Sequence, residues 1–266
     1  MAKHLAHDYS VLMIVWLRLA VGSTIVAAHV VPRFGARVLW PHAPLLQIGR
    51  GLSSLIAMAL LYRGFRSLPL AECTAIVFVA PVLANILSAL FLKETGNRFS
   101  WLAAALSFVG VLIIARPGSS LYTWQALFPI GAAIALASQI ALTRALATYD
   151  DPRVTAFFGP FLGCGLLAFV LPVYWRTPDG AIDTAMFAAI GCIAAAAQIL
   201  HVLAYRFGTT HEVAPFTYIS VPMSIALGWW IFDASPDAGS LLGASLIVFS
   251  GLAMLRGFRP PAVTAP

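Results

Sequence analysis

Long apolar runs separated by short polar gaps dominate the sequence of this chain. Nine runs come close to the roughly 20 residues that a helix needs to cross the hydrocarbon core of a bilayer. They cover residues 9–31, 43–62, 73–92, 99–115, 124–143, 154–175, 185–205, 213–232 and 238–256. Transmembrane barrel strands would instead alternate apolar and polar residues. The pattern therefore predicts an all-α membrane protein with nine transmembrane helices.

The second half of the chain repeats the first at an offset of 141 residues. Pro81 and Pro222 are separated by this offset, and each lies near the start of a stretch of small and apolar residues. The first four runs, shifted by 141, fall on the last four. The run 124–143 has no counterpart, because its shifted position would precede Met1. We therefore predict two repeats of five helices, with the first helix of the first repeat missing.

A duplicated unit of five helices is inverted, because an odd number of spans places the second copy upside down in the membrane. Inverted repeats around a central site are a common architecture of secondary transporters. The predicted division of the chain is an incomplete first repeat at residues 1–118, a second repeat at 121–258 and a tail at 259–266.

Composition and charge agree with the membrane prediction. Hydrophobic residues make up 61% of the chain and charged residues only 10%, with a mean hydropathy of +0.90, whereas a soluble domain is about one-quarter charged. The net charge of +6 lies mainly in the gaps between apolar runs, which argues against a nucleic-acid partner. These gaps hold nine Lys and Arg residues on one side of the membrane and five on the other, so we expect a cytoplasmic C-terminus and an external N-terminus.

Two stretches of the sequence carry a resemblance to a known family. The first is LYRGFRSLPLAECTAIVFVAPVLANILSALFLKE with GVLIIARPG, and the second is APFTYISVPMSIALGWWIF with FSGLAMLRGF. They resemble the EamA type of the drug/metabolite transporter superfamily, and the resemblance extends from about Lys3 to Phe258. In that family a proline precedes a small and apolar run that ends in an acid such as Glu94, and the next helix carries a glycine such as Gly110.

The resemblance implies ten helices, a location in the bacterial inner membrane and transport of small metabolites by alternating access. The family favours amino acids or related metabolites, and we expect export. The chain departs from the family pattern in lacking the first helix. It also places its second acid, Asp233, directly after Phe232.

Polar side chains inside the apolar runs are the candidates for substrate contact, because burying them in a bilayer is expensive. Arg18 and Arg50 lie well inside their runs, and no acid lies deep enough to neutralise both, which favours an anionic or zwitterionic substrate. A structural bond to backbone carbonyls or to a neighbouring acid is the alternative for each. The predicted substrate-binding residues are Arg18, Arg50, Asn85, Gln139, Gln198 and Tyr218.

Gating and coupling are assigned to prolines and to titratable residues of the runs. Pro81 and Pro222 each remove a helix hydrogen bond, so we expect kinks that let half-helices rock. Asn85, one turn after Pro81, can bond substrate or the backbone that the proline frees. His201 is the one histidine expected deep in a run, for proton coupling or for packing. Glu72 is either a coupling acid or a partner of a helix N-terminus.

A non-transporting or decayed membrane scaffold is the alternative to a transporter, because of the missing helix. An intramembrane enzyme is disfavoured, since His211 and Glu212 do not begin an HExxH motif and no paired deep carboxylates or GxSxG motif occur. We therefore predict no catalytic residue, metal or cofactor. The predicted partners are the lipid bilayer and a small-molecule substrate. The GxxxG patterns at 159–163 and 239–243 leave a homodimer open, although packing inside the monomer is the preferred explanation.

Overall fold

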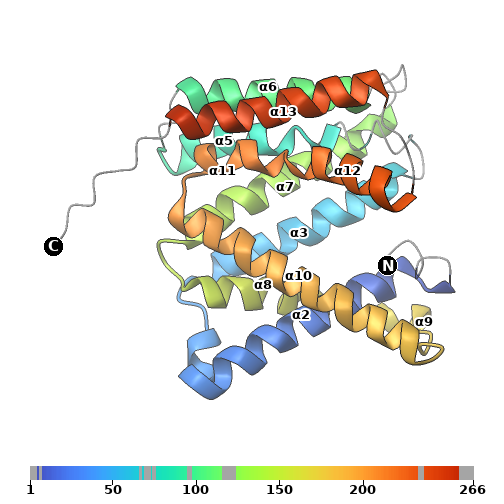
Figure 1. The fold of residues 1–266 in the computed structure, drawn as a ribbon. Coiled ribbons are helices and arrows are strands. Elements are labelled where there is room, and N and C mark those ends of the chain that lie inside the picture. The colour runs from blue at the N-terminus through green and yellow to red at the C-terminus, as the bar shows by residue number, and fades with distance from the viewer. Residues whose placement is uncertain are drawn as a thin grey trace. The chain divides into compact units, whose positions relative to one another are not determined.

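The computed structural model describes residues 5, 8–65, 68, 73, 76–94, 98–115, 124–232 and 237–257. Helices make up all the regular structure in these residues, so the predicted all-α class is confirmed (Figure 1). The elements are α2 (Val11–Phe34), η1 (Ala36–Leu39), α3 (Pro44–Phe65), α5 (Ala80–Phe91), α6 (Arg98–Ala115), η3 (Trp124–Ala126), α7 (Leu127–Leu146), α8 (Pro152–Ala168), α9 (Leu171–Tyr174), α10 (Ala181–Phe207), α11 (Thr210–Thr217), α12 (Ser220–Phe232) and α13 (Ala238–Gly257).

Each predicted apolar run coincides with a helix or with a pair of helices. Four helical segments of the described chain are long and apolar enough to cross a membrane on their own: Leu12–Phe34, Pro44–Phe65, Trp124–Leu146 and Ala181–Phe207. Shorter apolar helices lie at Ala80–Phe91, Trp101–Ile114, Pro152–Ala168 and Ala238–Ser250. The chain is thus a multi-pass membrane protein.

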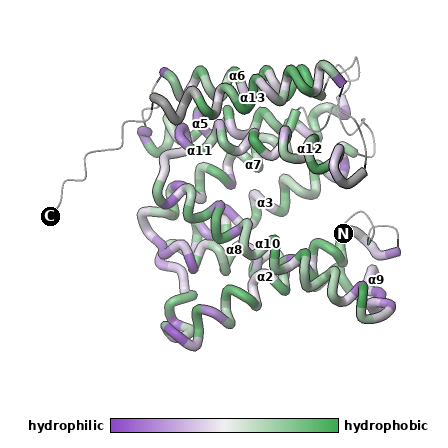
Figure 2. Tube along the Cα trace, viewed as in Figure 1, coloured by the Kyte–Doolittle hydropathy of each residue, from purple (hydrophilic) through white to green (hydrophobic). Residues whose placement is uncertain are grey.

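The distribution of hydropathy fits a surface that lipid covers. Apolar residues follow the bodies of the helices, and hydrophilic residues gather at their ends and in the connections (Figure 2). Large apolar side chains such as Leu45, Phe169 and Trp230 are more than four-fifths exposed, at 82%, 84% and 83%. Exposing such a large apolar surface to water would be unfavourable, whereas the hydrocarbon chains of a bilayer can cover it without this cost.

Three of the predicted helices are broken, and a proline follows each break. Two turn residues precede each new helix, at 78–79, 169–170 and 218–219. Pro81 and Pro172 lie at the second position of α5 and α9, and Pro222 lies at the third position of α12. Proline fits the first turn of a helix, where its missing N–H is not needed. Backbone bonds such as Val79 N–H to the Ile76 carbonyl oxygen and Val221 N–H to the Tyr218 carbonyl oxygen continue through the turn residues, so the α-helical ladder is interrupted in the turn before Pro81 and Pro222, where a proline kink is expected. The rocking of half-helices at these positions stays a prediction.

By its contacts the chain divides into two compact units. Unit 1 comprises Met1–Leu55 and Leu142–Gly208, and unit 2 comprises Ile56–Ala141 and Thr209–Pro266. Each unit takes segments from both predicted repeats, and α3 and α7 contribute to both units. The repeat boundaries at 118 and 121 stay a prediction.

In unit 1, α2 packs against α8 and α10 (Figure 1). The offset of 141 relates the run of α2 to the run of α8, so the two copies of one predicted helix lie together. Trp16 Nε1 donates to the carbonyl oxygen of Cys164 at 3.0 Å. A side chain at Gly163 would meet Leu19 of α2, which explains the glycine at this crossing.

In unit 2, α6 and α13 run side by side (Figure 1). They are again related by the offset. The hydroxyl oxygens of Ser107 and Ser250 lie 2.5 Å apart. A Cβ added at Gly110 would lie 2.8 Å from the Gly243 carbonyl oxygen, and one at Gly243 would lie 2.5 Å from that of Gly110. Both glycines are needed for this close approach, which places the GxxxG glycine Gly243 in packing within the chain.

Candidate functional site

The predicted site residues are distributed over both units. Unit 1 holds Arg18, Arg50, Gln198 and His201, and unit 2 holds Pro81, Asn85, Gln139, Tyr218 and Pro222. Glu72 lies outside the described residues. Arg18 is exposed on α2, while Gln198 on α10 and Gln139 on α7 are half-buried.

Arg50 lies in a packed polar cluster of unit 1. Its side chain is 2% exposed. Nε donates to Thr143 Oγ1 at 2.8 Å, and Nη1 donates to the Thr155 carbonyl oxygen at 3.3 Å. Nη2 is buried without a partner. Gly159 of α8 lies against Nη1, so no side chain fits at that position.

Asp150, in the turn between α7 and α8, extends this cluster. Its carboxylate is fully buried and accepts from the His42 backbone N–H at 2.7 Å and from Gln47 Nε2 at 2.8 Å. Gln47 Nε2 also lies 2.9 Å from Thr155 Oγ1, which connects Asp150 to the residue that binds Arg50. The sequence analysis missed Asp150 because it lies in a gap between apolar runs.

These contacts match the structural alternative stated for Arg50, a bond to a backbone carbonyl, and Asp150 lies in the same buried network through Gln47 and Thr155. The substrate contact of Arg50 stays a prediction.

Polar residues also join the segment before α2 to the start of α10 in unit 1. Tyr9 Oη donates to Asp183 Oδ2 at 2.6 Å and accepts from the Asp179 backbone N–H at 2.7 Å. Arg176 pairs with Asp179 at 2.7 Å. The hydrogen bond to Asp183 raises the pKa of Tyr9, so its hydroxyl keeps its proton at neutral pH. These contacts fix one end of unit 1.

Asn85 of α5 combines complete burial with an unpaired amide. Its side chain is 0% exposed, and neither Oδ1 nor Nδ2 has a hydrogen-bond partner. The amide therefore does not bond the backbone freed at the break, which was the alternative to substrate contact. Leaving such groups unpaired costs on the order of 1–3 kcal/mol. Natural proteins keep such a cost mainly where a polar group has a task.

Tyr218 satisfies the broken backbone instead. Tyr218 Oη donates to the Phe78 carbonyl oxygen at 2.8 Å, and the two rings lie 6.0 Å apart. Val82 and Leu83 both donate their backbone N–H to Val79, so no backbone bond to Phe78 from the start of α5 replaces this contact. A residue at one break thus caps the carbonyl at the other break of unit 2.

The end of α5 meets the start of α11 through a second set of contacts in unit 2. Glu94 Oε2 accepts from the Thr210 backbone N–H at 3.2 Å, and Ser88 Oγ donates to Thr210 Oγ1 at 2.8 Å. His211 Nε2 lies 3.1 Å from the Glu94 carbonyl oxygen. His211 is 1% exposed, whereas His201, the histidine predicted deep in a run, is half-buried within α10, and its coupling role stays a prediction.

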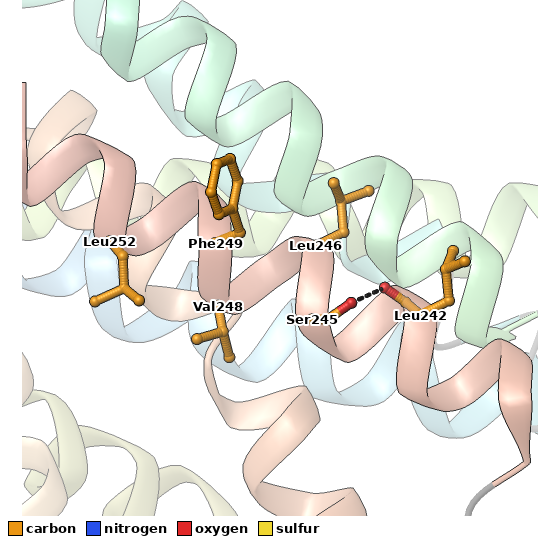
Figure 3. A pocket seen from close by; sticks show the side chains of 6 residues that line it. All are labelled: Leu242, Ser245, Leu246, Val248, Phe249 and Leu252. Atoms are coloured by element: carbon orange, nitrogen blue, oxygen red, sulfur yellow. Dashed lines mark hydrogen bonds between the residues drawn. The ribbon is translucent and has the colours of Figure 1, made fainter.

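A hollow on the exposed face of α13 lies apart from the predicted site residues. Figure 3 shows its lining residues, all from this one helix: Leu242, Ser245, Leu246, Val248, Phe249 and Leu252. Ser245 Oγ donates to the Leu242 carbonyl oxygen at 2.8 Å. None of the predicted site residues contributes to this hollow. An apolar, exposed helix face of this kind suits lipid chains.

Metal ligation finds no support in the described part of the chain, which holds no group of three or more His, Cys, Asp or Glu side chains placed to bind an ion. The candidate site is therefore composed of hydrogen-bonding groups at broken helices, and Asn85, Tyr218 and the α5–α11 junction are its described members.

Comparison with known proteins shows that the chain is similar to transporters. Residues 1–116 match the EamA-like transporter family. The chain is 27% identical to a riboflavin transporter of Rhizobium johnstonii over 84% of its own length and 74% of the relative's. It is 23% identical to an S-adenosylmethionine uptake transporter of Rickettsia conorii, over 85% and 76%. It is 25% identical to the pseudopaline exporter CntI of Pseudomonas aeruginosa, over 91% and 85%.

A solved crystal structure has the same fold, with a TM-score of 0.80 at 16% identity, over 95% of this chain and 89% of that one. The family match, the transporter relatives and the apolar helices agree, and none of them points to an enzyme. The chain is thus similar to the EamA-like transporter family over residues 1–116 and to named small-molecule transporters over most of its length.

Proposed function

We propose that the chain is a secondary transporter that moves a small metabolite across the bacterial inner membrane by alternating access, with its C-terminus in the cytoplasm. The observation that carries this proposal is the pair of broken helices in unit 2. Their breaks lie at 78–79 and 218–219, about one repeat offset apart, and Tyr218 contacts Phe78 across them. Discontinuous helices at matching positions of two repeats are typical of substrate sites in secondary transporters.

The breaks supply the moving parts. At each interruption the half-helices are joined by turn residues whose backbone bonds span three residues rather than four, so their angle can change with little disturbance of a regular α-helical ladder. Pro81 and Pro222 keep the breaks in place, because each prevents the new helix from extending backwards. In this mechanism α5 and α12 change their angles to open one side of the site and close the other.

Asn85 is the proposed substrate contact in unit 2. Its amide offers an NH2 group with two N–H donors and an acceptor oxygen, both unpaired and buried one turn from Pro81. When α5 moves away from α11, this amide becomes available to a polar group of the substrate. Arg18, exposed on α2, is the proposed cation for an anionic or zwitterionic substrate.

Substrate and direction are proposed from chemistry and relatives together. The relatives are named for riboflavin, S-adenosylmethionine and pseudopaline, which are polar metabolites of small size. One relative is named for uptake and another for export. We retain export of an amino acid or a related anionic or zwitterionic compound as the proposal.

A transport assay tests the proposal. Radiolabelled riboflavin, S-adenosylmethionine and a panel of amino acids are offered to everted and right-side-out membrane vesicles that contain the chain. Vesicles without the chain serve as the control. Chain-dependent accumulation of a compound in everted vesicles supports an exporter, whereas accumulation in right-side-out vesicles alone contradicts the direction. A folded, inserted chain that moves no member of the panel favours the non-transporting scaffold instead.

A further inference from the structure

The end of α2 carries an exposed group of arginines in unit 1. Arg33 lies in the last turn of α2, Arg37 in η1 and Arg153 in the first turn of α8, and all three residues are exposed. Hydrophilic residues gather at this end of α2 (Figure 2). None of the three was assigned to the substrate or to the broken helices. Together they are the basic surface of unit 1.

The basic surface rests on a packed part of the fold. Gly35, whose φ of 81° is a conformation that favours glycine, ends α2 and turns the chain into η1. Leu39 of η1 is buried in a cluster with Val26 and Val30 of α2, and Phe157 of α8 packs against this cluster. Because η1 thus contacts both α2 and α8, the three arginines project from neighbouring elements that support one another.

Little of the positive charge is neutralised by the described residues. Asp151 Oδ1 lies 3.8 Å from Arg153 Nε, and both side chains are 46% exposed, so water weakens this ion pair. Arg33 Nη1 lies 2.6 Å from His29 Nε2, which brings no negative charge. The side chain of Arg37 has neither an ion pair nor a hydrogen bond with a described residue. The surface therefore keeps a positive charge that a partner can bind.

Aromatic side chains place the basic surface at the level of the lipid headgroups. The segment Leu12–Phe34 is long and apolar enough to span a membrane, so Phe34 marks its boundary. The guanidinium carbon of Arg153 lies 4.1 Å from the centre of the Phe34 ring. Phe34 and Trp40 are 48% and 76% exposed. Exposed rings of this kind, tryptophan above all, are typical of the boundary between hydrocarbon and headgroups.

We propose that the basic surface of unit 1 binds the headgroup of an anionic phospholipid such as phosphatidylglycerol. The lipid phosphate accepts hydrogen bonds from the arginine side chains, which suit phosphate oxygens, and the acyl chains cover exposed apolar residues at this end of α2. A zwitterionic lipid carries its own cation, so its attraction to the arginines is weaker. This site is separate from the proposed transport function, and binding needs no change in protonation or helix packing.

Lipid binding to the purified chain tests the proposal without any transport. The chain in a neutral detergent receives equal amounts of dioleoyl phosphatidylglycerol and dioleoyl phosphatidylcholine, and native mass spectrometry measures the ratio in which the two lipids are bound. We expect a preference for phosphatidylglycerol of about 5- to 30-fold, which corresponds to one or two arginines that act on the lipid charge. Equal binding of the two lipids overturns the proposal.

Paired variants locate the preference on the chain. Arg33→Gln/Arg37→Gln should lose most of it, whereas Arg33→Lys/Arg37→Lys keeps both charges and should retain it. The matched control is Lys93→Gln/Arg98→Gln, which removes two exposed cations of unit 2 and should also retain it. Equal losses in the two Gln pairs would show that total charge attracts the lipid, and would overturn the proposal. If Arg33→Gln/Arg37→Gln does not fold, Arg153→Gln decides instead and should lower the preference.

Competition distinguishes a lipid site from a site for a soluble anion. Glycerol 3-phosphate carries a phosphate without acyl chains, so an excess of it should displace little of the bound phosphatidylglycerol. Phosphatidylglycerol should also raise the thermal unfolding temperature of the chain in detergent, and glycerol 3-phosphate should not. Full displacement together with an equal rise in the unfolding temperature would identify a soluble phosphate compound as the ligand and overturn the proposal.

Discussion

At Asn85 a single substitution can distinguish a functional role from a structural one. Its amide is fully buried with both polar atoms unpaired, which destabilises the folded chain. Replacing a buried unpaired polar group with an apolar group of similar shape is neutral or stabilising. We expect Asn85→Leu to keep or raise the thermal unfolding temperature in detergent and to lower transport. A variant that loses stability and transport together would indicate a structural role.

Gly159 makes room for a buried charge. A methyl group at this position would collide with Arg50 Nη1, and the guanidinium cannot move without giving up Thr143 or the Thr155 carbonyl oxygen. We expect Gly159→Ala to lower the free energy of unfolding by about 1–3 kcal/mol.

Gly165 provides the control for this prediction on the same helix. An added Cβ there meets nothing within 4 Å, so Gly165→Ala should be neutral or slightly stabilising. Thermal unfolding of both variants in the same detergent makes the comparison. Equal losses in the two variants would show that α8 tolerates no alanine, irrespective of Arg50.

For single residues, the sequence predicted which polar side chains lie inside helices better than it predicted the residues that bond them. Arg50 was identified from its depth in an apolar run, but its cluster, in which Arg50 bonds Thr155 and Gln47 bonds Thr155 and Asp150, joins residues 103 to 108 positions apart along the chain. His211 was overlooked because burial depends on which helix ends meet in space. Glu94 and Trp101, which enclose it, come from two other helices.

The broken helices are the feature that matters most at the scale of elements. The prolines predicted an interruption, and it lies in the turn before each proline, where the ring interferes with the helical backbone. The partner of the backbone freed there follows from no local pattern: the Phe78 carbonyl oxygen accepts from Tyr218. Exposed carbonyls in a membrane must be satisfied internally, so a break needs such a partner.

Tyr218→Phe tests this contact. The variant keeps the ring against Phe78 and removes the hydroxyl that donates to the Phe78 carbonyl oxygen. We expect a loss of about 1 kcal/mol in the free energy of unfolding, together with faster amide exchange in residues 76–83, since the break is no longer fixed. The exposed Tyr149→Phe is the control and should change neither quantity. Unaltered exchange at the break would show that packing alone holds it.

For the whole molecule, the offset of 141 predicted which helices correspond but not how they group. Corresponding helices pack together within the units, as α2 with α8 and α6 with α13. Each unit therefore mixes both predicted repeats, because contacts form between copies as well as along the chain. The offset in the sequence does not by itself say which helices pack against each other in space.

Membrane orientation is the remaining property of the whole molecule that the charge pattern predicts. The gaps hold nine Lys and Arg residues on one side and five on the other, and the richer side is expected in the cytoplasm. Reporter fusions test this at two points: after residue 258, and in the segment 175–180 between α9 and α10. A fluorescent protein should be active at the first point, and a periplasmic phosphatase at the second. The opposite pattern would invert the chain, and the same side at both points would mean that three predicted spans between them, 185–205, 213–232 and 238–256, do not all cross the membrane.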